Sequence, residues 1–118
     1  MTSASPRVLV ILLNFRTAPM TLRAAAAALA DLPEGGELVI VDNASGDGSA
    51  GILSKAITER GWSKENRVRL ILSDVNGGFG AGNNLGLRAG MSDGSAPDFF
   101  YILNSDAFPD RGCLPALI

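Results

Sequence analysis

The sequence predicts an α/β fold, with a Rossmann-like parallel sheet and helices on both faces. Two observations lead to this prediction. Unbroken apolar runs, such as Val8–Leu13 and Leu38–Val41, are typical of strands buried on both faces. The segments between the runs have helical spacing and are long enough for right-handed crossovers, so the strands should be parallel. At 118 residues the chain has room for one domain, residues 1–118.

The first half of the chain alternates strand and helix. After the strand at Val8–Leu13, Thr17 can cap a helix and Pro19 can open it, and this helix should run to about Ala30. The second strand is Leu38–Val41. An amphipathic helix comes next, with these apolar residues at helical spacing: Ile52, Leu53, Ala56 and Ile57.

The second half repeats the pattern. Val68–Leu72 predicts a third strand, and Asn76–Gly90 is a glycine-rich loop that leads into a third helix. A loop at residues 92–98 precedes a fourth strand at Phe99–Leu103. In a doubly wound strand order of 3-2-1-4, the switch point at which such sheets bind ligands lies between the first and fourth strands.

Composition excludes several classes of protein. Twelve acidic side chains oppose ten basic ones, so no nucleic-acid-binding surface is expected. The single cysteine, Cys113, and the lack of histidine exclude an internal disulfide, the usual zinc sites and Ser-His or Cys-His nucleophile pairs. No apolar run approaches the roughly 20 residues of a membrane span, and the N-terminus lacks a signal-peptide layout, so we expect a cytoplasmic protein.

Polar residues follow the predicted strands: Asn14, Asp42, Asn43, the loop 74–84 and Asp106. Because the carboxyl ends of parallel strands meet at one edge of the sheet, we expect Asn14, Asp42 and Asp106 to line one cleft. These oxygen-rich side chains suit a ribose, a base edge and a hard cation, Mg²⁺ or Mn²⁺, that holds phosphates. Asp42, directly after the second strand, is the first candidate for a ligand contact.

Four segments carry motifs in a fixed order. They are Leu13–Arg16 (LNFR), Val41–Ser49 (VDNASGDGS), Asn76–Gly86 (NGGFGAGNNLG) and Leu103–Asp106 (LNSD). These resemble V-N-Y-N, V-D-N-x-S-x-D-G-S, N-x-G-F-x-x-G-N-N-x-G, and L-N-P-D or D-x-D of the family 2 glycosyltransferases. The resemblance covers almost the whole chain and is greatest to the bacterial rhamnosyltransferase-like branch. It implies the GT-A fold, of which this chain would be the N-terminal, donor-binding half.

The resemblance also implies an activity. An inverting enzyme of this family would move a sugar from a UDP- or dTDP-sugar to a hydroxyl acceptor, here a glycan or lipid-linked saccharide, by single displacement. The nucleotide-binding residues would be Asn14, Asp42, Asn43, Asp47, Asn83 and Asn84. Asp42 would contact the base or ribose, and Asp106, with Asn104, would bind the divalent cation on the diphosphate.

Two departures from the family pattern stand out. Asn104 occupies the place of a frequent Asp and Ser105 that of a common proline, which should weaken metal binding. The acceptor half of the family, with its general base, would follow beyond Ile118. We therefore expect no catalytic base in these residues and a fragment of a longer enzyme. We also expect a homodimer that covers apolar C-terminal residues such as Phe99 and Leu117.

Other interpretations use the same residues. The chain could be a non-catalytic nucleotide-binding module. Gly80, Gly82 and Gly86 suggest a dinucleotide site, although their spacing and their place after the third strand differ from that fingerprint, or they serve only turns and packing.

The polar residues have simpler interpretations too. Asp42 and Asn43 can make a turn before a helix that Asp47 or Ser49 caps. Asn83 and Asn84 can cap or solvate a helix start, and Asp106 can be a turn residue. Trp62 and Tyr101 are predicted to be packing residues.

Overall fold

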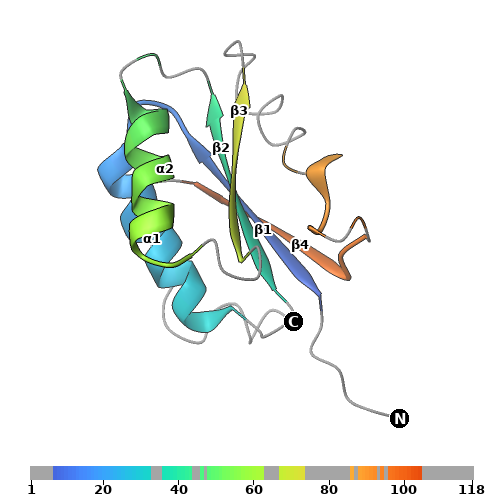
Figure 1. Ribbon diagram of the computed structural model, residues 1–118. Helices are drawn as coiled ribbons and strands as arrows, with labels where there is room; N and C mark the ends of the chain where they lie inside the picture. The colour runs from blue at the N-terminus through green and yellow to red at the C-terminus, as the bar shows by residue number, and fades with distance from the viewer. Residues whose placement is uncertain are drawn as a thin grey trace.

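The computed structural model describes residues 7–32, 36–43, 46, 48–62, 67–73, 86, 88–92, 94 and 96–104 (Figure 1). Its elements, in chain order, are β1 (Val8–Asn14), α1 (Ala18–Asp31), β2 (Glu37–Asn43), α2 (Ser49–Glu59), β3 (Val68–Ser73) and β4 (Phe99–Asn104). Every predicted strand is confirmed. β1, β3 and β4 are each one residue longer than expected at the carboxyl end, and β2 is longer by one residue at its start and by two at its end. The glycine-rich loop lies largely outside the described residues.

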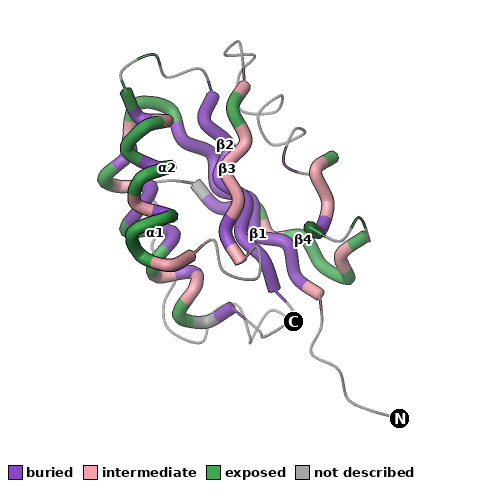
Figure 2. Tube along the Cα trace, viewed as in Figure 1, coloured by how far each residue is buried: buried purple, intermediate pink, exposed green. Residues whose placement is uncertain are grey.

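The four strands form one parallel sheet in the order β3-β2-β1-β4. This confirms the predicted Rossmann-like order and its switch point between β1 and β4. The register sets Asn14 opposite Asp42 and Leu13 opposite Asn104, so the carboxyl ends of β2, β1 and β4 lie together. The two inner strands, β1 and β2, are buried along their whole length, as their unbroken apolar runs predict (Figure 2).

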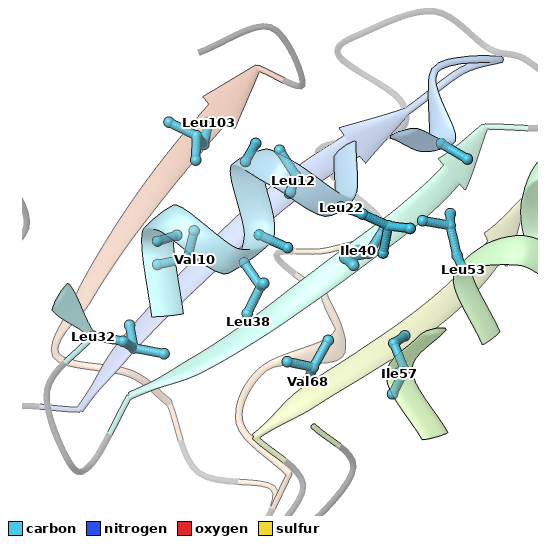
Figure 3. Close-up of a cluster of buried hydrophobic side chains, with 14 of the residues drawn as sticks. Val10, Leu12, Leu22, Leu32, Leu38, Ile40, Leu53, Ile57, Val68 and Leu103 are labelled. Carbon is cyan, nitrogen blue, oxygen red and sulfur yellow. The ribbon is translucent and has the colours of Figure 1, made fainter. Parts of the chain in front are cut away.

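Both long helices pack on the same face of the sheet (Figure 1). Alternate strand residues such as Val10, Leu12 and Ile40 point at Leu22 of α1 and Leu53 of α2 (Figure 3). Ala24, Ala25 and Ala28 of α1 are fully buried, because their small side chains let the helix approach the strands closely. Trp62 and Tyr101 pack against this cluster, which confirms that they are packing residues.

The opposite face carries a second apolar cluster, formed by Leu9, Ile11, Leu13, Val39, Val41 and Met91. Gly86, Arg88 and Ala89 are helical, and Gly86 comes close to this face. A Cβ on Gly86 would lie 2.6 Å from Cγ2 of Ile11, so glycine is needed for packing here. Among the three glycines of the dinucleotide interpretation, the one that the structure describes therefore acts in packing.

One element differs from its prediction. Leu53 and Ile57 of α2 are buried, but Ile52 is 50% exposed. In the described part of the chain, α2 packs against β3, which is an edge strand of the sheet. Leu72, near the end of this edge strand, is 60% exposed. No helix among the described residues is long and apolar enough to cross a membrane.

Candidate functional site

Asp42 and Asn14 meet at the carboxyl edge of the sheet, as predicted. The side-chain amide Nδ2 of Asn14 donates a hydrogen bond to Oδ1 of Asp42 at 2.8 Å. Both residues are buried, with exposures of 0% for Asn14 and 5% for Asp42. A carboxylate in such surroundings is held in one orientation, because few other rotamers are open to it.

Two threonines hold the Asn14 amide from its other side. Thr21 Oγ1 donates to Oδ1 of Asn14 at 2.6 Å, and Thr17 Oγ1 donates to the same oxygen at 3.3 Å. Hydroxyl donors on the carbonyl oxygen leave the NH₂ group to face Asp42, which as a carboxylate only accepts. Thr21, Asn14 and Asp42 therefore form a hydrogen-bonded chain from α1 to the strand end.

Thr21 was not predicted to belong to the site. The available signal was its spacing, since Thr17 and Thr21 are four residues apart and so share one face of a helix that starts just after Asn14. Thr17 also differs from its prediction. It occupies the N-cap position of α1, but its side chain makes no capping hydrogen bond and turns to Asn14 instead.

The simpler interpretation of the second strand end is wrong for Ser49. Gly48, with φ of 87°, is the N-cap of α2, and Ser49 is a buried residue of the first turn. The left-handed backbone at this position suits glycine, and Ser49 is not the cap because it already lies within the helix. Asp47, the other residue of that interpretation, lies outside the described residues. Asn43 is also buried, at 3% exposure, beside Asp42.

The predicted metal ligands are not described as a set. Asp106 lies outside the described residues, and only the backbone of Asn104 is described, at the end of β4. Asn83 and Asn84, which were predicted to bind the nucleotide, also lie outside the described residues. Within the described ranges, no three acidic or Cys side chains gather to hold a metal ion. The side-chain oxygen Oδ1 of Asn14 already accepts hydrogen bonds from two hydroxyl groups, so it is unsuited to be a cation ligand.

Phe15 and Arg16 follow β1 at the same edge. Phe15 is 39% exposed, and the guanidinium carbon of Arg16 lies 5.1 Å from the centre of its ring. Arg16 has φ of 57°, in the left-handed region. The exposed ring of Phe15 and the cation of Arg16 therefore follow directly after the buried Asn14 at this edge.

A second polar cluster lies at the amino edge of the sheet, away from this site. Glu37, the first residue of β2, accepts hydrogen bonds from the backbone N and the hydroxyl of Ser92, both at 2.9 Å. Arg69 and Arg7 lie 3.4 Å and 3.7 Å from its carboxylate oxygens. Arg69 also donates to the carbonyl oxygen of Gly90. These contacts fasten the segment before β4 to the sheet.

The structure defines an α/β domain with a buried polar pair at the carboxyl ends of β1 and β2, the edge at which open α/β sheets commonly bind ligands. A family model for glycosyl transferase family 2 matches residues 9–118. The chain therefore belongs to glycosyl transferase family 2. No curated protein matches the chain in sequence.

Solved structures of glycosyltransferases share the fold. The mannosyltransferase PcManGT from Pyrobaculum calidifontis, in complex with GDP-Man and Mn²⁺, is 22% identical with a TM-score of 0.74; the match covers 92% of this chain and 30% of that one. TarS residues 1–349 from S. aureus is 19% identical with a TM-score of 0.71, covering 94% of this chain and 31% of that one. A TarS complex with UDP-GlcNAc matches equally well, at 19% and 0.71. This chain thus spans about a third of the length of these solved chains.

Proposed function

We propose that this chain is the donor-binding part of a nucleotide-sugar-dependent glycosyltransferase in which Asp42 binds the nucleoside. One observation carries the proposal: a buried carboxylate at the carboxyl edge of the sheet, with one oxygen held by Asn14 at 2.8 Å. The similar structures that contain GDP-Man and UDP-GlcNAc support a nucleoside diphosphate sugar as the ligand. For this chain we propose a UDP- or dTDP-sugar.

The chemistry of Asp42 suits a nucleoside. Base N–H groups and ribose hydroxyls are donors, and a carboxylate is an acceptor that they can satisfy. A hydrogen bond to a charged group contributes about 1.5–3 kcal/mol, more than a neutral pair. Because Asn14 orients the carboxylate before a ligand arrives, little side-chain entropy is lost on binding. We propose Asn14, Asn43, Asp47, Asn83 and Asn84 as the remaining residues of the nucleotide pocket.

We further propose that Asp106, with Asn104, binds Mg²⁺ or Mn²⁺. The position of the Asn104 backbone, beside β1, and the Mn²⁺ in the similar mannosyltransferase support this assignment. Oxygen ligands suit these hard cations. When bound, the cation would neutralise the charge of the diphosphate leaving group.

For the complete protein we propose an inverting single displacement by an acceptor hydroxyl of a glycan or lipid-linked saccharide, as in the rhamnosyltransferase-like branch. The general base that takes the proton of this hydroxyl would lie outside residues 1–118. The match covers only 30% of the similar mannosyltransferase chain, which supports a general base outside the matched region. We accordingly expect the isolated chain to bind a donor without transferring its sugar, whereas robust transfer by these residues alone would contradict this assignment of the base.

The test of the nucleotide site compares two buried carboxylates of β2. Asp42→Asn keeps the size of the side chain and an acceptor for Asn14 but removes the charge. We expect calorimetric titration with UDP and dTDP to show about a tenfold or greater loss of affinity, with or without Mn²⁺. Glu37→Gln, at the opposite edge, is the matched control and should leave the affinity unchanged. Equal affinity of wild type and Asp42→Asn would refute the site.

The assignment of the metal has its own test. Asp106→Ala should remove only that part of the nucleotide affinity that depends on Mn²⁺. Its affinity in EDTA should equal that of the wild-type chain. A loss of affinity that is the same with Mn²⁺ and with EDTA would assign Asp106 to nucleotide contact rather than to metal binding.

A further inference from the structure

The backbone of Arg16 is unusual for its residue type. Its φ of 57° is the one positive φ of a residue other than glycine in the described part of the chain. The left-handed conformation disfavours a side chain that carries a Cβ, although asparagine adopts it more readily than other residues. Backbone conformations of this kind persist where function requires them and cluster at ligand sites. The residue that adopts it here lies two positions after Asn14.

Arg16 is also the cation of this edge. The described residues that end the strands or directly follow them are 14–17, 42–43, 46, 48–49, 72–73 and 103–104, and no other Arg or Lys is among them. The guanidinium lies over the ring of exposed Phe15, 5.1 Å from its centre. Cation–π attraction uses the face of the ring and the π surface of the guanidinium. Arg16 itself is exposed, so a ligand at this edge can reach its guanidinium.

We infer that Arg16 binds a phosphate group of the nucleotide, so that the site prefers nucleoside diphosphates over nucleosides. The inference rests on the proposed function, because it assumes that Asp42 binds the nucleoside. Asp42 itself repels phosphate, and a cation on the same edge offsets that repulsion. The planar guanidinium matches two phosphate oxygens at once. Helix α1 begins two residues later with no acidic residue in its first turn, and its N-terminus adds partial positive charge.

One substitution separates the backbone conformation of Arg16 from the charge of its side chain. Arg16→Asn removes the cation and places at this position a residue that tolerates positive φ. The backbone conformation is therefore compatible with the new residue, and the variant should keep its fold, which its Tm reports. It should bind UDP about 10- to 100-fold more weakly, the loss expected for one charge-assisted contact. Its affinity for uridine should stay within about twofold of the wild-type value.

The experiment titrates UDP and uridine into the full chain in EDTA, so that no cation bridges the phosphates. Arg60→Asn is the matched control, because the guanidinium of Arg60 also lies over an aromatic ring, 4.9 Å from the centre of Trp62. Arg60 is the C-cap residue of α2. This control should leave both affinities unchanged. Thermal unfolding of each variant reports the stability.

Several results would overturn the inference. Arg16→Asn that binds UDP as tightly as Arg60→Asn does would exclude the phosphate contact, as would an equal loss for UDP and uridine. If the wild-type chain binds UDP through Asp42 and Arg16→Asn leaves that affinity unchanged, only the role of Arg16 fails. A wild-type chain that binds neither UDP nor dTDP would overturn the proposed function and this inference together.

Discussion

Asn14 links the first helix to the strand end that carries Asp42. Its amide accepts from Thr21 at 2.6 Å and donates to Asp42 at 2.8 Å, and all three residues are buried. Hydrogen bonds in a buried chain polarise and orient one another. Thr21 is therefore a positioning residue, which acts on the ligand through Asn14 and Asp42.

Removal of the Thr21 hydroxyl tests this role. Thr21→Val keeps the shape of the side chain but leaves Oδ1 of Asn14 without its shortest donor, so the unfolding free energy should fall by about 1–3 kcal/mol. The affinity for UDP should fall several-fold, because Asp42 loses its fixed orientation. Thr21→Ser should restore both quantities. If Thr21→Val lowers stability while UDP affinity stays at the wild-type value, Thr21 is structural only.

The hydrogen-bond partners of the buried polar residues, such as Thr21, could not all be predicted from the sequence. The meeting of Asn14 and Asp42 follows from a general rule, since both end strands that are neighbours in a parallel sheet. The partner of Asn14 in α1 depends on how the helix lies over the strand, which spacing alone does not determine. Glu37 was missed for a similar reason, because its partners Arg7, Arg69 and Ser92 are distant in the chain.

Among the secondary-structure elements, burial on both faces made the strands predictable. The runs in β1 and β2 are apolar throughout because helices and other segments cover both sides of them. The buried face of α2 was predicted less well. Ile52 continues the apolar stripe that Leu53 and Ile57 form, yet it is exposed. The width of an apolar stripe in the sequence does not tell how much of it the sheet covers.

Two glycines in helical segments test the packing of these elements. Gly86→Ala would bring a Cβ to 2.6 Å from Ile11, a fully buried residue of the central strand, so overpacking should lower the unfolding free energy by about 1–3 kcal/mol. Gly51→Ala, exposed in α2 with nothing within 4 Å of its Cβ, should instead raise it by up to about 1 kcal/mol. Urea unfolding of both variants would show opposite signs. A Gly86→Ala variant as stable as Gly51→Ala would contradict the close approach.

For the whole molecule, the edge of the sheet at β4 matters most for association. Phe99, Phe100 and Ile102 of this strand are 43%, 50% and 46% exposed. An apolar edge strand favours pairing with another chain, and a twofold dimer is the simplest closed arrangement. We therefore keep the homodimer as a prediction for these 118 residues.

Light scattering over a dilution series measures that association. Ile102→Lys should shift the chain toward monomer, because the lysine would place a charge on the edge strand. Ile52→Lys is the control, since Ile52 is as exposed, at 50%, but lies on α2. A wild-type chain that stays monomeric at high concentration would contradict the dimer, as would equal dissociation by both variants.

The central claim is that a nucleotide binds at the carboxyl edge beside Asp42. Nuclear magnetic resonance of the ¹⁵N-labelled chain tests it most directly, because the Asn14 side-chain amide donates to Asp42 at 2.8 Å and reports any change at that carboxylate. On addition of UDP, we predict large shifts of the Asn14 side-chain NH₂ signals and small shifts for Ser92 at the opposite edge. Shifts at Ser92 with an unmoved Asn14 amide, or no shifts at all, would contradict the account.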